Sequence, residues 1–175
     1  DFRHEAVFVG SYIPHKEMVI HGLLEIQPDL DLAIWGNGWE KCGSSLLKRC
    51  LKGYALNATA YSRALQASAI CLGIMSGRVP GSSQGDEMTT RSFQIPACGA
   101  FMLHERTAEL ARYFDEGKEV ACFDTPEELS SKICHYLKHE NEREAIAAAG
   151  FKRCVPAYSY DARMAELISY VEGGF

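Results

Sequence analysis

The fold class follows from residues 6–39, which have the sequence AVFVGSYIPHKEMVIHGLLEIQPDLDLAIWGNGW. Residues 6–9 form an apolar run closed by a Gly-Ser pair, which is typical of a buried strand that leads into a loop. Apolar residues then recur with helical spacing over residues 15–26, until Pro28 stops the helix. A second apolar run, at residues 32–35, ends in Gly-Asn-Gly. This stretch therefore predicts a strand, a helix and a second buried strand in succession.

The rest of the chain continues this alternation. Short apolar runs predict further strands at residues 69–74, 100–103 and 120–123. Helical patterns predict helices at residues 44–50, 58–68, 88–98, 107–114, 141–153 and 160–171. Thr125, Pro126 and the two glutamates after them supply an N-cap, a proline at the first helical position and an acidic first turn. A further helix is expected to start there.

Strands that are apolar at every position and alternate with helices predict a parallel sheet that is covered on both faces. The expected fold class is α/β, a doubly wound parallel sheet with helices on both faces. Ligands bind such sheets at the carboxyl ends of the strands, so function is expected in the loops after residues 9, 35, 74 and 103. The only stretch that resembles a linker is residues 76–85, and one domain over residues 1–175 is expected.

Composition excludes several classes of protein. With 175 residues, 47% hydrophobic and 23% charged, the chain has a globular balance that is unlike disordered, collagenous or coiled-coil sequences. Its 18 Lys and Arg against 23 Asp and Glu argue against a nucleic-acid partner. The apolar runs are shorter than the roughly 20 residues of a transmembrane helix, and no signal peptide is evident. A cytoplasmic location is therefore expected.

The cysteines and histidines do not predict a metal site. The seven cysteines are odd in number and contain no CxxC pair, a pattern that favours reduced, buried thiols over disulfides or a zinc site. The six histidines form neither HExxH nor HxH spacing, so no metal ligands are assigned.

Two glycine loops follow the first two predicted strands. Gly10 and Ser11, with Lys16 at the following helix start, offer backbone N–H groups and a cation to an anion such as phosphate. Gly36 and Gly38 after the second strand allow a ligand to approach closely. Plain turns with a solvated lysine explain the same residues, because neither a dinucleotide-binding GxGxxG nor a P-loop GxxxxGK is present.

Residues 85–99 contain the richest set of candidate site residues. A glycine loop there precedes a helix whose first turn carries hydroxyls, with Arg91 and Gln94 expected on one helix face. The start of such a helix can bind phosphate, with Arg91 as a charged donor and Gln94 bonded to a sugar hydroxyl. The alternative is that Thr89 or Thr90 caps the helix and Arg91 is solvated. The residue types alone leave both possibilities open.

Longer segments of the sequence resemble a known family, and this resemblance is more specific than the residue types alone. Nearly the whole chain resembles the C-terminal region of CgeB-like (spore maturation type) glycosyltransferases, which are group 1 nucleotide-sugar glycosyltransferases. The resemblance rests on FVGS at residues 8–11, IWGNGW at 34–39, TTRSFQIPACGAFML at 89–103, HERTAELARYFDEGKEVACFDTPEELSSKICHYLKHENEREAIAAAG at 104–150 and YSYDAR at 158–163. It implies the GT-B architecture, in which two Rossmann-like domains face each other. This chain resembles the C-terminal half, which binds the donor, and lacks the N-terminal half, which holds the glycosyl acceptor.

The resemblance also implies residue roles. Gly10 and Ser11 match the glycine turn near the donor diphosphate, and Lys16 stands where a basic residue is usual. Gly36 and Gly38 match the glycines of the second loop.

Arg91, together with Thr90, matches the position at a helix start where the family carries a basic residue that faces phosphate. Related enzymes also carry two glutamates seven residues apart, one towards the donor sugar and one towards the ribose, and those positions are Asp86 and Gln94 here. Asp86 is one methylene shorter, and Gln94 is neutral.

The catalytic residues implied by the resemblance are Lys16, Asp86 and Arg91. The implied donor-binding residues are Gly10, Ser11, Gly36, Gly38, Thr90 and Gln94. The substrate would be a UDP-, GDP- or ADP-sugar, with no cofactor and no metal required. A binding module that keeps the fold but has lost catalysis is the alternative, because Gln94 cannot supply a charge.

Overall fold

The chain is built around a six-stranded, entirely parallel sheet with the strand order β3-β2-β1-β4-β5-β6. The computed structural model describes residues 2–77 and 85–173. The strands are β1 Ala6–Val9, β2 Leu32–Trp35, β3 Leu51–Gly53, β4 Ile70–Gly73, β5 Met102–Glu105 and β6 Ala121–Phe123. Strand order reverses between β1 and β4, so the crevice that this topology provides for a ligand lies beyond their carboxyl ends.

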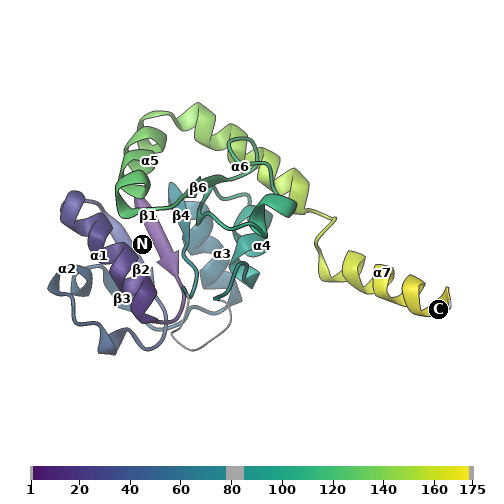
Figure 1. Cartoon of the computed structure of the whole chain (residues 1–175), viewed down its shortest axis with the longest axis horizontal. Coiled ribbons are helices and arrows are strands. Elements are labelled where there is room, and N and C mark those ends of the chain that lie inside the picture. Colours follow the sequence, from purple (N-terminus) through teal and green to yellow (C-terminus); the bar gives the residue numbers. More distant parts are fainter. Residues whose placement is uncertain (1, 78–84, 174–175) are drawn as a thin grey trace.

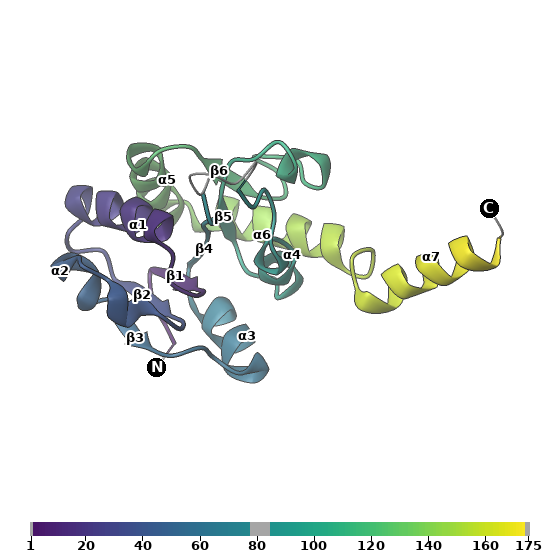
Figure 2. The same ribbon diagram turned by 60° about the horizontal axis from the view of Figure 1, so that its bottom comes forward.

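Helices cover both faces of the sheet, and the views in Figures 1 and 2 place α1 and α3 on opposite sides of it. The helices are α1 Pro14–Ile26, α2 Ser45–Lys48, α3 Ala58–Ala67, α4 Thr90–Ala97, α5 Pro126–Lys138, α6 Glu140–Cys154 and α7 Tyr160–Glu172, with short 3-10 turns at Trp39–Lys41 and Leu110–Arg112. The predicted doubly wound α/β fold is confirmed.

Strands β1, β2, β4 and β6 are buried on both faces, and their side chains alternate between two apolar cores. In β1, Ala6 and Phe8 pack in the core with α1, α2 and α5, whereas Val7 and Val9 pack in the core with α3 and α4. All four residues are buried. This two-sided burial explains why the strand is apolar at every position.

Local signals placed several helix ends correctly. The Thr125 hydroxyl accepts from the backbone N–H of Glu128 at 3.2 Å, and Pro126 is the first residue of α5, as predicted. Pro96 is tolerated in the last turn of α4, and Gly99, with φ +71°, follows its end. The helix predicted over residues 88–98 is therefore confirmed, with a later start.

Three predictions about elements need correction. Strand β3 was not expected, because its three residues include Lys52 and Gly53 and it forms by pairing with the end of β2. The helix predicted at residues 107–114 is only a 3-10 turn, Leu110–Arg112, since the Thr107 hydroxyl accepts from the Leu110 N–H and also donates to the Glu87 carbonyl. The strand predicted at residues 100–103 lies two residues later.

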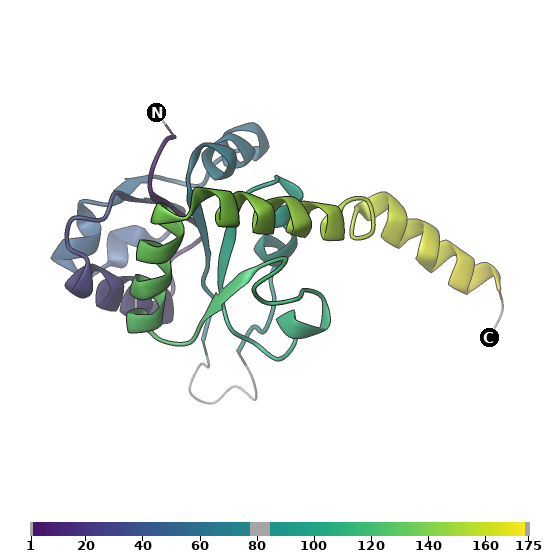
Figure 3. The same ribbon diagram turned by 90° about the horizontal axis from the view of Figure 1, so that it is seen from above.

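Helix α7 extends away from the sheet at the C-terminal end of the described chain (Figures 1 and 3). None of its residues is buried, and several apolar side chains on it are exposed. Among the described residues, no helix combines the length and apolarity needed to cross a membrane.

Candidate functional site

Two cations meet at the carboxyl end of β1. The Nζ of Lys16, from the first turn of α1, lies 5.8 Å from the centroid of the Phe8 ring, and the Cζ of Arg91, from α4, lies 5.3 Å from it. Phe8 is fully buried and Lys16 is 4% exposed. The structure therefore brings together two residues 75 positions apart that the sequence analysis assigned to the diphosphate.

Lys16 is held in an environment that disfavours its charge. Its Nζ donates to the Ser11 carbonyl at 3.1 Å. Burial, and then the positive charge of Arg91, lower the pKa of Lys16 to about 8, against the opposing effect of Asp86. A bound anion would relieve both unfavourable effects.

The guanidinium group of Arg91 packs against Phe8, and only some of its N–H groups have hydrogen-bond partners. A guanidinium nitrogen, Nη2, donates to the Ile74 carbonyl at 3.4 Å, while the buried Nε has no hydrogen-bond partner among the described residues. Burial lowers the pKa of Arg91, although the group stays charged. Within residues 2–77 and 85–173, neither Arg91 nor Lys16 is within ion-pair distance of a carboxylate. A buried lysine and a half-buried arginine without a paired carboxylate are chemically suited to contact an anion.

The glycine loops after β1 and β2 allow the backbones at the ends of these two strands to come into contact. Gly36 has φ +151°, and a Cβ there would lie 2.0 Å from the Gly10 carbonyl oxygen. A Cβ at Gly10 would lie 2.7 Å from a guanidinium nitrogen of Arg91. Trp39 Nε1 donates to the same Gly10 carbonyl at 2.8 Å. Close packing thus requires glycine at both positions, and it places the Gly10 backbone beside the Arg91 cation.

The next three predicted site residues are Ser11, Gly38 and Asp86. Ser11 is exposed and contributes its carbonyl to Lys16, and Gly38, with φ +85°, caps the short turn before Trp39. Asp86 is exposed, and its Oδ2 accepts from the Ser76 hydroxyl at 2.5 Å. Its charge also favours the charged forms of Lys16 and Arg91, so it lies in their neighbourhood.

Thr90 and Gln94 are exposed one turn apart on α4. They line a cavity of about 630 Å³ together with aromatic side chains, among them Phe93, Tyr113 and Tyr158. Gln94 also lines a neighbouring groove with Tyr61, whose hydroxyl interacts electrostatically with Arg91. Arg91 and Gln94 are therefore both near Tyr61, as expected for positions three apart on one helix face.

A second polar pair lies beside this site, and its two residues were not predicted from the sequence. His15 Nε2 lies 2.7 Å from Glu105 Oε1, and Glu105 Oε2 accepts from the Met75 N–H at 2.9 Å. The hydrogen bond with Glu105 raises the pKa of His15, and burial partly opposes it. Glu105 thus joins the end of β5 to the loop after β4 and to α1. Glu105 lies two residues after the end of the strand predicted at residues 100–103, but its partner lies 90 residues away in sequence.

His104 supports α4 from the core. It is fully buried, and its Nε2 lies 2.8 Å from the hydroxyl of Ser92, which in turn accepts from the Thr89 N–H at 3.2 Å. Burial lowers the pKa of His104 to about 4, so the ring is neutral at pH 7. This chain of contacts fixes the start of the helix that carries Arg91.

Comparison with known proteins gives a consistent family. The family model described as "Glycosyl transferase-like" matches residues 16–169. The spore protein CgeB of Bacillus subtilis (strain 168) is 34% identical over 77 residues, which cover 44% of this chain and 23% of CgeB.

Two solved structures share the fold. Sucrose-phosphate synthase from Thermosynechococcus elongatus has a TM-score of 0.72 at 12% identity, over 100% of this chain and 47% of that one. HepE from Anabaena, solved in complex with UDP and glucose, has a TM-score of 0.70 at 13% identity, over 97% of this chain and 48% of that one. The chain spans less than half the length of these relatives.

Proposed function

Since the chain belongs to the glycosyl transferase-like family, as a CgeB-like group 1 glycosyltransferase domain, we propose that it binds the nucleoside-diphosphate part of a sugar donor. The observation that carries the proposal is the pair of cations, buried Lys16 and half-buried Arg91, at the carboxyl end of β1. A diphosphate between them would supply the ion-pair partner that neither cation has among the described residues. The UDP in the HepE structure supports a donor of this class.

The same two cations would assist the reaction. When the bond from the sugar to the diphosphate breaks, negative charge develops on the leaving diphosphate. Lys16 and Arg91 are already fixed where that charge would form, so they can stabilise it without reorganisation. We therefore propose transfer in which the chain's own cations, rather than a metal ion, neutralise the leaving group.

An Asp-x-Asp pair, a common way of holding a metal at a diphosphate, does occur at Asp29 and Asp31. It precedes β2 and so lies at the edge of the sheet opposite to Lys16 and Arg91. Asp31 is also bonded there to His4 Nδ1 at 2.9 Å. Its position supports the proposal that the diphosphate is not held by this pair.

The nucleoside and the sugar would lie beside the diphosphate, next to Thr90, Gln94 and Asp86. We propose that Gln94 hydrogen-bonds a ribose hydroxyl, with Thr90 beside it, and that Asp86 faces the donor sugar. The aromatic cavity next to α4 is large enough at about 630 Å³ to take part of the nucleoside. UDP, GDP and ADP donors all remain within this proposal.

The acceptor would be held by a further domain. The chain spans less than half the length of the relatives described above. We propose that residues 1–175 are the donor half. We propose a cytoplasmic location, because all seven cysteines are free thiols and most are buried, as in proteins from a reducing compartment.

A non-catalytic binding module is the second candidate. Two observations favour it: Gln94 cannot supply the charge of a glutamate, and the carboxylate of Asp86 is engaged by the Ser76 hydroxyl. The reading frame upstream of Asp1 separates the candidates. A further α/β domain there favours the enzyme, and a start codon directly before Asp1 favours the module.

The binding proposal itself is tested by phosphorus NMR of UDP titrated with the chain. We expect both phosphorus signals to shift with the wild type and to stay near their free positions with Arg91→Ala. Equal shifts with both proteins would overturn the proposed contact.

A further inference from the structure

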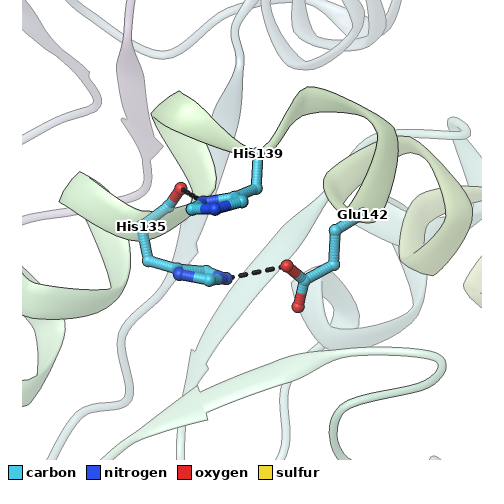
Figure 4. Close-up of side chains that lie close together, drawn as sticks. All are labelled: His135, His139 and Glu142. Atoms are coloured by element: carbon cyan, nitrogen blue, oxygen red, sulfur yellow. Dashed lines mark hydrogen bonds and ion pairs between the residues drawn. The ribbon is translucent and has the colours of Figure 1, made fainter.

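Two histidines and a glutamate meet at the corner between α5 and α6, as Figure 4 shows. His135 lies in the last turn of α5, His139 follows the end of that helix, and Glu142 lies in the first turn of α6. Each residue presents one possible ligand atom, and these atoms all lie within 4.8 Å of one another. Because α5 starts directly after β6 and runs back along the sheet, this corner lies at the edge opposite to Lys16 and Arg91.

The hydrogen bonds of the cluster prepare it for a cation. The Nδ1 of His139 lies 2.7 Å from the His135 carbonyl oxygen, which can only accept, so Nδ1 carries a proton. In the neutral ring this leaves the lone pair of Nε2 free, and metal-bound histidines are oriented by the same kind of bond. On the other side, His135 Nε2 lies 2.7 Å from Glu142 Oε2.

The three side chains are close enough together to reach one small divalent ion after they rotate. The two imidazole rings are stacked, with centroids 4.1 Å apart and planes 18° apart. Ligand atoms around a tetrahedral zinc ion lie about 3.3 Å from each other, given bonds of about 2.0 Å. A metal ion lies in the plane of each imidazole that binds it, so the stacked rings must turn apart before both nitrogens can bind one ion. All three side chains are exposed, so these rotations would not disturb the core.

We propose that His135, His139 and Glu142 bind a divalent transition-metal ion, with Zn²⁺ as the favoured metal and water at the fourth position. Two imidazole nitrogens and one carboxylate oxygen are ligands that zinc prefers, whereas magnesium requires mainly oxygen ligands. The ion takes the position now occupied by the proton between His135 and Glu142. That proton is released to solvent or moves to the other ring nitrogen.

Such an ion would join α5 and α6 at their corner. Arg143 Nη1 donates to the Tyr136 carbonyl at 2.7 Å across the same corner. The far end of α6 packs against α4, where the Cys154 thiol contacts the Phe93 carbonyl at 3.6 Å. The role assigned to the ion is therefore structural, and it would stabilise the folded chain because the unfolded chain lacks the site.

The test is calorimetric titration of the full 175-residue chain with zinc chloride in a non-chelating buffer. Cys134 is exposed and thiolates bind zinc, so every protein carries Cys134→Ser. We expect one ion per chain and an increase in melting temperature. Magnesium chloride is expected to give neither effect.

Matched variants identify the ligands. His139→Ala should weaken zinc binding at least about 10-fold, because even residues behind the first ligands contribute 10–100-fold. Glu142→Gln, which keeps the size and hydrogen-bonding capacity of the side chain, should also weaken it. His21→Ala is the control, since His21 lies 3.4 Å from the exposed Glu25 with no second histidine one turn away.

Two results would overturn the proposal. One is the absence of zinc binding by the parent protein, which would leave the cluster as a hydrogen-bonded surface pair. The other is equal affinity in the parent, His139→Ala and Glu142→Gln proteins, with circular dichroism showing that all are folded.

Discussion

Lys16 and Arg91 lie against the same buried ring, with Nζ 5.8 Å and Cζ 5.3 Å from the centroid of Phe8. The positive charge of Arg91 disfavours the charge on Lys16, and burial strengthens repulsion between like charges. In the part of the chain that the structure describes, no carboxylate forms an ion pair with either of them. The arrangement disfavours the empty site and favours an anion, which is the basis of the predictions about binding.

The affinity for UDP should depend on pH through Lys16. Its pKa is lowered to about 8, chiefly by burial, and a bound diphosphate would raise it again. The charged form binds, so affinity should be level from pH 7 to about 8 and then fall by up to about tenfold per pH unit. Titrations at pH 7.5 and 9 measure this change. Lys16→Arg stays charged and should bind equally at both values; the same pH dependence in that variant would assign it to another group.

Gln94→Glu should keep or strengthen the binding of nucleotides that carry a ribose. The carboxylate accepts hydrogen bonds from ribose hydroxyls, and bonds to a charged acceptor are stronger than those to an amide. Competition between UDP and 2′,3′-dideoxy-UDP measures the ribose contribution in each protein. A large loss of affinity in Gln94→Glu would show that α4 is not oriented as proposed.

Glu105→Gln should destabilise the fold by about 1–2 kcal/mol, and more at pH 6 than at pH 9. The His15 pKa is raised, so its contribution is complete below its ordinary value of 6.5 and is lost as pH rises through the folded value. The Glu105 pKa is lowered overall, because the bonds from His15 and Met75 outweigh burial. Its contribution is therefore present above 4.5 and lost as the pH falls further.

Urea denaturation at the two pH values measures the difference. The control is Glu166→Gln, which removes an exposed partner of Arg163 and should change the free energy of unfolding by less than about 0.5 kcal/mol. Equal destabilisation by Glu105→Gln at pH 6 and pH 9 would contradict a charged His15–Glu105 pair.

Gly36→Ala should lower the free energy of unfolding by about 2–3 kcal/mol. The added Cβ would lie 2.0 Å from the Gly10 carbonyl oxygen, and the residue also has φ +151°. Gly117→Ala is the matched control, because Gly117 has φ +79° but no atom within 4 Å of the added Cβ. It should cost only about 1 kcal/mol, from conformation alone. Similar thermal melts for the two variants would show that the loops after β1 and β2 are not in close contact.

Sequence patterns predicted the parts of the fold that local residues determine. The β1 strand is apolar at every position because both of its faces are buried, and α5 begins at its Thr-Pro signal because Thr125 caps the helix through its own hydroxyl. Strand β3 was not predicted, because it is a strand through its pairing with β2 and not through its own composition. Residues 78–84, within the predicted linker-like stretch, lie outside the described residues.

The site was predictable only in part. Sequence placed Lys16 and Arg91 near a diphosphate, but their burial and common contact with Phe8 depend on how α1 and α4 pack. His135 and His139 were not assigned as metal ligands, because Tyr136 stands where the HExxH motif has its glutamate. A spacing of four residues, followed by Glu142 three positions later, was the available signal.

The measurement that tests the central claim most directly is isothermal titration of the chain with UDP, GDP and ADP, each compared in wild type and Arg91→Ala. We predict selective binding of one diphosphate by the wild type and a loss of about 1–3 kcal/mol in Arg91→Ala. The exposed Arg63→Ala serves as the control and should bind as the wild type does. Absence of binding to all three, or an affinity that Arg91→Ala leaves unchanged, would contradict a donor site between Lys16 and Arg91.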